Sequence, residues 1–339
     1  MRPVSRQRLL GMASAQLAAI AMAGCTLSHR APVRYIDLKF PVAGSAGQYA
    51  HTVDAAGALW FIDGDAIVRE TGPSQRRIAH HPRIRSGSLF WYEGAVYAVD
   101  GDGRNMERFD KRLRAHAVPI PVRYAPVDGA VADARYRWVV LARPISHELA
   151  VLDVWKWYAE RVPESIAPFA AALAGGPHGK KYLVVGDQRR PLVSIENRWY
   201  RGVRVVRVPD NVCFSNSGAG WHVPVDARGR DADRTWVTTG EHVASIELST
   251  KRILRVWDAG GCAVHIVAAN GDSATVVVAS RDGDKYVSSL KRFDRAGVHS
   301  MPQYGRIAGV AGAALMDRYR RLWWFDPKAH AFICRTPLS

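Results

Sequence analysis

The sequence lacks an apolar run long enough to span a bilayer, and it is poor in acidic residues and in cysteine. Its apolar stretch from Leu9 to Gly24 falls short of the ~20 apolar residues that a membrane-spanning helix needs. This stretch follows Met1 to Arg8, a short segment with three arginines and no acid. A positive segment followed by a short apolar one is the layout of an export signal, so a permanent transmembrane anchor is the weaker interpretation.

The end of this signal, Met22-Ala23-Gly24-Cys25, resembles the lipobox of bacterial lipoproteins. The resemblance implies that Cys25 receives a lipid and becomes the first residue of the mature protein, and acyl chains can anchor a protein without a spanning helix. Thr26 resembles the residue that sorts such proteins to the outer membrane. We therefore expect a lipid-anchored protein of the bacterial cell envelope, on an outer membrane and facing the periplasm. The alternative is a plain secretory signal that leaves Cys25 as a free thiol.

Three segments follow from this interpretation. Residues 1–24 are the expected lipoprotein signal peptide. Residues 25–47 hold the lipidated end, a linker and an alternating stretch, Val33 to Phe40, which can add a closing strand to a sheet. Residues 48–337 form the expected folded domain, which is ample for a large core.

The shortage of acidic residues leaves the chain strongly basic. It carries 47 Lys and Arg against 31 Asp and Glu, a formal net charge of +16, and it stays basic once the signal's arginines are removed. A basic protein outside the cytoplasm meets anionic lipids, acidic polymers and acidic proteins, whereas nucleic acid is not an expected partner. The positive charge is spread along the chain with only short clusters, such as Arg318-Tyr319-Arg320-Arg321, so a merely solvated basic surface is the competing interpretation.

The chain has only four cysteines. With Cys25 lipidated, an oxidising compartment allows one disulfide among Cys213, Cys262 and Cys334, and one thiol is left over. The sequence does not choose the pair, and we predict Cys213 with Cys262. Cys262 and His265 have the spacing of half a zinc site, but no second pair follows, so no metal is expected.

Long amphipathic helices are also absent, and a repeat takes their place. "VDAAGALWFID" from Val53 and "MDRYRRLWWFD" from Met316 both read Asp, four residues, Leu-Trp and a second Asp. Short β-rich runs recur at intervals of about 40 to 50 residues, the period of a four-stranded propeller blade. These runs lie around Trp60, Val96, Val139, Val184, Trp236, Val276 and Trp323.

The repeat predicts an all-β fold, a seven-bladed β-propeller, with six or eight blades as alternatives. Glu164 to Ala174 is the one segment expected to be helical, as an insertion in this pattern. The recurrent tryptophans are expected to pack between blades. Three Asp-Gly-Asp turns suit tight hairpins, and they begin at Asp63, Asp100 and Asp282.

The repeat units resemble two groups of propellers. "VASIELSTKRILRVWD" from Val243 is similar to the repeats of YVTN and quinoprotein-type propellers, and "VDAAGALWFID" resembles an element of virginiamycin B lyase-like and NHL propellers. The resemblance covers most of residues 48–337. It implies a rigid disc of blades, and it leaves the activity open because one fold carries many functions.

No catalytic motif is complete. Gly179-Lys180 sits in a partial phosphate loop that no helix follows, and the sequence contains no G-x-S-x-G elbow. The Asp-Gly-Asp turns are expected to be solvated turns and not calcium ligands. Isolated groups with potential chemistry remain, and they are His80-His81, His147-Glu148, and Ser215 and Ser217 with His222.

Two functions fit these observations. The first is a binding or scaffold module that recognises a protein or an envelope polymer through a propeller face. The second is a metal-dependent propeller enzyme, lactonase-like or lyase-like, whose sign would be His, Asp or Glu side chains converging at the channel. We favour binding and expect no cofactor, because no catalytic residues can be assigned.

Overall fold

The computed structural model describes most of the chain after residue 34. Contacts divide the chain into Met1–Arg34 and Tyr35–Ser339, and every described residue lies in the second unit. The described residues are 35–42, 50–73, 75–80, 84, 87–92, 94–100, 105–118, 130–135, 138–143, 148–153, 158–162, 168–175, 181–187, 191–197, 203–209, 212–213, 221–222, 226–229, 233–311 and 314–338. The signal segment and Cys25 lie outside them.

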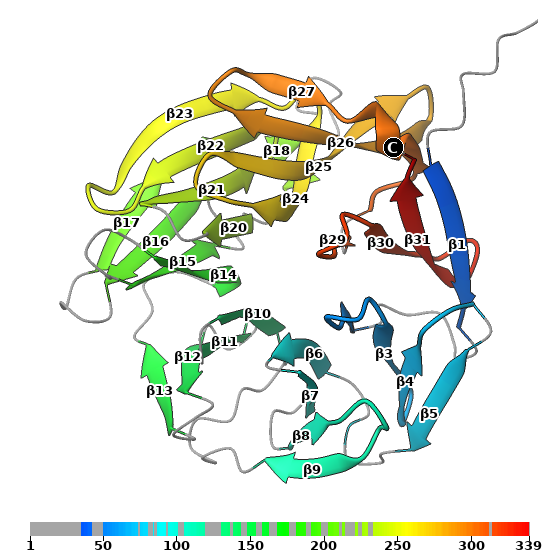
Figure 1. Cartoon of the computed structure of the whole chain (residues 1–339). Helices are drawn as coiled ribbons and strands as arrows, with labels where there is room; N and C mark the ends of the chain where they lie inside the picture. The colour runs from blue at the N-terminus through cyan, green and yellow to red at the C-terminus, as the bar shows by residue number, and fades with distance from the viewer. Residues whose placement is uncertain are drawn as a thin grey trace, which may run out of the picture. The chain divides into compact units, whose positions relative to one another are not determined.

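The unit is built of antiparallel sheets, and the first four follow chain order from inner to outer strand (Figure 1). Strands β2 to β5 are His51–Val53, Leu59–Asp63, Ala66–Glu70 and Arg76–His80. Strands β6 to β9 are Gly87–Tyr92, Ala95–Asp100, Met106–Phe109 and Ala115–Val118. Strands β10 to β13 are Ala130–Arg135, Trp138–Arg143, Glu148–Asp153 and Tyr158–Val162. Strands β14 to β17 are Pro168–Gly175, Lys181–Asp187, Leu192–Asn197 and Val203–Arg207.

The remaining strands complete the set. Strands β18 and β19 form a separate pair, Val212–Cys213 and Trp221–His222. Strands β20 to β23 are Asp226–Gly229, Arg234–Thr239, His242–Glu247 and Arg252–Asp258. Strands β24 to β28 are Cys262–Ala269, Ser273–Asp282, Lys285–Asp294, Val298–Ser300 and Arg306–Ala308, with a 3₁₀ turn at Pro302–Tyr304. The last sheet has the order β1-β31-β30-β29, from Tyr35–Pro41, Ala331–Pro337, Leu322–Asp326 and Leu315–Met316.

Successive sheets contact each other through their inner strands. The strands β2, β6, β10, β14, β20, β24 and β29 follow one another in this contact order. The last sheet also packs on the first, since Phe40 and Trp323 share a buried cluster with Leu59 and Phe61. Stacking of half-buried sheets in this manner buries both faces of each sheet, which is the β-propeller architecture that the sequence predicts. The number of blades stays a prediction.

The closing strand comes from the start of the unit. β1 runs antiparallel to β31 along its whole length, from Tyr35 opposite Pro337 to Pro41 opposite Ala331. The alternating sequence from Val33 to Phe40 predicts such a strand, and β1 confirms it over Tyr35–Pro41. Because the sheet combines the two ends of the unit, the ring is held by hydrogen bonds between its first and last strands.

The expected helix over Glu164 to Ala174 is wrong. The chain forms β14 at Pro168–Gly175, which pairs with β15 in the register Ala171 to Val185. A short apolar run fits a buried strand or a helix equally well, and the alanines tip the propensity towards helix. The neighbouring strand β15 offers a full ladder of hydrogen bonds, so tertiary pairing overrides the local preference.

Tryptophans pack between the sheets, as expected. Trp60, Trp236 and Trp323 are among the largest fully buried side chains. Trp60 lies in a cluster with Val96 of the next sheet, and Trp236 lies in one with Val276 of the next sheet. Replacement of such a side chain by alanine typically costs ~3–5 kcal/mol, so these contacts fix neighbouring sheets firmly against each other. Within the described part of the chain, no helix combines the length and the apolar character required to cross a membrane.

Candidate functional site

The turn between β2 and β3 is organised by the Asp54 carboxylate. Its Oδ1 accepts hydrogen bonds from the backbone N–H groups of Ala56 at 2.8 Å and Ala58 at 3.0 Å. Its Oδ2 accepts one from Trp60 Nε1 at 3.0 Å and lies 3.4 Å from Arg69 Nη2. A single carboxylate therefore caps the turn and orients the buried indole of the following strand.

The turn between β29 and β30 repeats this pattern at Asp317. Oδ1 accepts hydrogen bonds from the backbone N–H groups of Tyr319 and Arg321, both at 2.9 Å. Oδ2 accepts Trp323 Nε1 at 3.0 Å and Arg321 Nε at 2.7 Å. The Asp-(four residues)-Leu-Trp repeat of the sequence is thus a hydrogen-bonding unit that positions the same groups in two sheets.

The fourth residue of each turn has a left-handed backbone. Gly57 has φ +81° and Arg320 has φ +60°, and Leu113 occupies the matching place after Asp110 with φ +63°. Glycine adopts this conformation freely, whereas a residue with a Cβ loses roughly 1–2 kcal/mol there. Arg320 therefore occupies a place that favours glycine, and its backbone is held by the Asp317 turn and by the Tyr304 hydroxyl, which donates to the Arg320 carbonyl at 2.6 Å.

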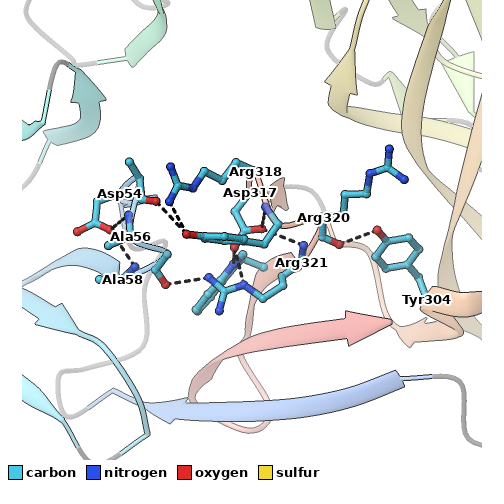
Figure 2. A network of polar contacts seen from close by, with 12 residues as sticks. Asp54, Ala56, Ala58, Tyr304, Asp317, Arg318, Arg320 and Arg321 are labelled. Atoms are coloured by element: carbon cyan, nitrogen blue, oxygen red, sulfur yellow. Dashed lines mark hydrogen bonds and ion pairs between the residues drawn. The ribbon is translucent and has the colours of Figure 1, made fainter. Parts of the chain in front are cut away.

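The two Asp turns meet at the seam between the last and first sheets (Figure 2). Arg321 Nη2 donates to the Gly57 carbonyl at 3.0 Å, and the Tyr319 hydroxyl lies 3.4 Å from the Ala55 carbonyl. The Tyr319 ring has the Arg318 guanidinium 4.6 Å from its centre and the Arg321 guanidinium 5.3 Å away. The two hydrogen bonds thus brace the basic turn against the neighbouring sheet, and the cation–π contacts hold the Tyr319 ring within the turn.

A cavity of about 500 Å³ lies on the other side of this turn, between β24, β25 and the end of β29. Its volume is within the range of small-molecule sites, roughly 300–1,000 Å³. The polar and charged residues of its lining are Asn270, Ser273, Thr275, Arg292, Asp317, Arg318 and Arg320. Apolar and aromatic groups form the rest: Val267, Ala268, Ala269, Met301, Tyr304 and Met316.

The lining of the cavity carries more positive than negative charge. The Asp317 carboxylate is only 3% exposed and is already paired with Arg321. Arg292 Nε lies 3.3 Å from Asp294 Oδ2, and the Arg292 side chain is 52% exposed. Among the described residues, no carboxylate pairs with Arg318 or Arg320. The cavity is therefore electropositive, and anions are its complementary ligands.

Neutral groups of the wall are fixed in place. Burial raises the pKa of Tyr304 above its ordinary value, so its hydroxyl stays protonated as the donor to Arg320. Asn270 Oδ1 accepts the backbone N–H groups of Asp272 at 2.9 Å and Ser273 at 2.7 Å. The carbonyl of Asn270 also accepts Trp236 Nε1 at 2.8 Å. These contacts hold the Asn270 side chain and the Tyr304 hydroxyl in defined positions.

The structure joins Cys213 to Cys262, the pair that the sequence analysis favoured. The disulfide closes a separation of 49 residues, and both cysteines are buried against Ala279. Cys334 is a free, buried thiol, and burial raises its pKa to about 12. Cys25 lies outside the described residues, so its lipidation stays a prediction.

The other candidate residues are scattered. Asp63-Gly64-Asp65 and Asp282-Gly283-Asp284 are hairpin turns of different sheets, with φ +63° at Gly64 and +60° at Gly283. Asp100 ends β7. His80 is an exposed residue of β5, 3.6 Å from Asp65, and His222 and His265 lie on β19 and β24. His81, Asp102, His147, Gly179, Lys180, Ser215 and Ser217 lie outside the described residues. Those described form no group of three metal-ligating side chains.

The cavity was not predicted from the sequence. Its clearest signal in the sequence is the Arg318-Tyr319-Arg320-Arg321 cluster, for which a merely solvated basic surface is the competing interpretation. Asn270 and Arg292 join this cluster only because β24 contacts β29 and β26 belongs to the same sheet as β24. No local spacing connects these residues along the chain.

The comparisons with known proteins agree on the fold. No family model matches the chain, and no curated protein matches it. Virginiamycin B lyase from Staphylococcus aureus superposes with a TM-score of 0.60 at 12% identity, over 90% of this chain and 100% of that chain. BBS1N, solved in complex with ARL6DN, gives a TM-score of 0.59 at 15% identity over 89% and 96%. The WD40 domain of Neurospora crassa Pan2 gives 0.54 at 10% identity over 86% and 90%.

These likenesses show that the chain folds as a β-propeller. They support no statement about its activity, because the sequence identities are low. The resemblance to virginiamycin B lyase-like propellers that the "VDAAGALWFID" element suggested is therefore confirmed as a resemblance of fold. The bacterial-lipoprotein part of the resemblance stays a prediction.

Proposed function

We propose that this chain is a lipid-anchored binding module of the bacterial cell envelope. Its propeller would recognise an anionic partner, a protein or an envelope polymer, while a lipid on Cys25 tethers it to the outer membrane on the periplasmic side. The lipobox-like Met22-Ala23-Gly24-Cys25 and the basic composition support the location. Propellers serve as rigid platforms for many functions, so the partner must be argued from the site.

The basic cavity carries the proposal. Its wall presents Arg320 without a carboxylate partner among the described residues, and the Asp317 turn and Tyr304 hold the Arg320 backbone in place. A concave and electropositive wall fits recognition of an anion. The structural neighbour BBS1N is itself bound to ARL6DN, which illustrates that this fold accommodates protein partners.

The anchoring part is tested by Cys25→Ser in cells. We expect the wild-type protein to sediment with membranes and to carry the mass of attached acyl chains. The variant should lose both the acyl mass and the membrane association. Equal fractionation and equal mass of the two proteins would overturn lipidation.

The recognition part is tested with purified protein beginning at Thr26, immobilised and exposed to envelope extracts. We expect a reproducible partner that is released as salt rises, because exposed charges are screened. Arg77→Ala serves as a control because Arg77 is an exposed residue of β5, outside the cavity. Arg320→Gly should weaken capture, whereas Arg77→Ala should not. Equal capture by Arg320→Gly and the wild type would show that the cavity is not the binding site. Turnover of lactones by the protein with a bound metal ion would favour the enzyme alternative over the binding function.

A further inference from the structure

We infer that the cavity beside Arg320 binds a monosaccharide-sized anion that carries a phosphate or a carboxylate group. The inference rests on the proposed binding function, and it narrows the partner to the chemical group that enters the cavity. It is carried by the size of the cavity, the chemistry of its wall and the Arg320 side chain, which has no carboxylate partner among the described residues.

Size and wall chemistry favour a compact polar ligand. About 500 Å³ is room for one sugar-sized unit, and the cavity is bounded by residues of β24, β25 and β29. The Thr275 hydroxyl makes no hydrogen bond to the described residues. Asn270 uses its side-chain oxygen on two backbone N–H groups, which leaves its amide N–H₂ as a donor. Hydroxyl and amide groups of this kind hydrogen-bond sugar hydroxyls, while Met301 and Met316 cover an apolar ring face.

The arginines supply recognition of the anion. A guanidinium presents a planar fork of donors that matches carboxylate and phosphate oxygens. Arg320 extends away from the Asp317 network, on the side of Tyr304 (Figure 2). Arg292 lines the same cavity, whereas the Arg318 guanidinium donates to the Tyr319 hydroxyl and extends towards Asp54 (Figure 2). An anionic group beside Arg320 therefore has Arg292 as its second cationic neighbour. Asp317 does not compete, because its oxygens are bonded to the turn and to Arg321.

The left-handed backbone of Arg320 makes glycine the natural substitution for a test. The matching residue of the first turn is Gly57, whose backbone has the same sign of φ without the steric cost. Leu113 also carries a side chain at this place of its turn, so the conformation by itself says nothing of a ligand. Arg320→Gly is therefore expected to remove the guanidinium and to leave the turn intact.

The test measures binding of small probes by calorimetry to the protein beginning at Thr26. The probes are glucose 6-phosphate, glucuronate and uncharged glucose, so that the first two distinguish phosphate from carboxylate. We expect at least one of the two anions to bind, glucose to bind at least tenfold more weakly, and Arg320→Gly to weaken the anion at least tenfold. Arg77→Ala should bind like the wild type.

Thermal unfolding separates the ligand role from a structural role. Arg320→Gly should unfold at an equal or higher temperature than the wild type, so a loss of binding cannot be assigned to misfolding. Equal affinity for glucose and the anions, or unchanged affinity in Arg320→Gly, would overturn the inference. Tighter binding of a poly-glutamate peptide than of either sugar acid would replace the sugar with an acidic protein segment. If no probe binds while envelope extracts still yield a partner, the inference fails and the proposed function survives.

Discussion

Asp37 and Arg335 lie 298 residues apart in the chain and form a two-point ion pair across β1 and β31. Arg335 Nε donates to Asp37 Oδ1 at 2.7 Å, and Arg335 Nη2 donates to Oδ2 at 2.6 Å. The remaining Nη1 donates to the carbonyls of Tyr304 at 2.7 Å and Arg306 at 3.1 Å. The guanidinium also stacks over the Tyr35 ring at 3.8 Å. One buried side chain thus ties the closing strand to the body of the unit.

Arg335→Met should destabilise the fold by about 3 kcal/mol, the lower end of the loss expected when one partner of a buried ion pair is removed. The lower end applies because the Asp37 side chain is 28% exposed and keeps some hydration. Urea unfolding followed by tryptophan fluorescence measures the change. Asp37→Asn retains an acceptor and should cost less, and a smaller loss for Arg335→Met than for Asp37→Asn would contradict this assignment.

Asp54→Ala and Asp317→Ala should each lower the free energy of unfolding by about 2 kcal/mol, since two backbone N–H groups and one indole N–H lose their acceptor. Asp54→Asn and Asp317→Asn keep a side-chain oxygen for the backbone and should cost less. Urea midpoints of the four variants provide the comparison. Identical losses in the Ala and Asn variants would show that capping of the turn contributes little.

The disulfide between Cys213 and Cys262 should contribute about 2–4 kcal/mol, the usual value for a closed loop of this order. We expect Cys213→Ala with Cys262→Ala to unfold at lower urea than the wild type. Cys334→Ala is the matched control, because it removes a cysteine without opening a loop. An unchanged midpoint in the double variant would mean that the bridge does not constrain the unfolded chain.

Cys334 should be inert to thiol reagents in the folded protein. Its pKa is raised to about 12 by burial, so at pH 8 almost no thiolate is present for reaction. In the protein that begins at Thr26, Ellman's reagent should detect no thiol before unfolding and one thiol afterwards. Detection of a thiol in the folded protein would show that Cys334 is accessible or that the disulfide is incomplete.

Glu70 should lower the free energy of unfolding by an amount that depends on pH. Burial raises its pKa above 4.5 in the folded state, although Arg76 acts in the opposite direction. The folded protein then holds the proton more tightly than the unfolded chain, so this contribution is fully favourable below 4.5 and is lost as pH rises through the folded pKa. Glu70→Gln should therefore gain stability relative to the wild type between pH 4 and 7, as urea unfolding can measure. A shrinking difference over that range would mean that the Arg76 ion pair outweighs burial.

The architecture was predictable because its signals are local and repeated. The Asp54 and Asp317 motifs each fix a turn, a buried indole and the next strand within a few residues, so their similarity in sequence reports similarity in structure. The Ala-rich β14 was mispredicted because an apolar run without alternation does not distinguish a buried strand from a helix. Whether this segment forms a strand depends on β15, because β15 is its pairing partner.

The candidate site was less predictable because it is assembled across sheets. Arg318 and Arg320 were visible as a basic cluster, but nothing along the chain places Asn270 or Arg292 beside them. The left-handed backbone of Arg320 could be read only by aligning its turn with that of Gly57. The sequence therefore shows which residues carry charge, whereas only the folded structure shows which of them lie close together.

The pairing of β1 with β31 has a consequence for biosynthesis. A ribosome makes Tyr35–Pro41 before Ala331–Pro337, so β1 has no partner until β31 has been made. Ile36 and Leu38 remain half exposed even after pairing, so their apolar surface meets water before and after closure. Such a chain cannot close prematurely, a useful property for a polypeptide that we propose is threaded through a membrane before it folds.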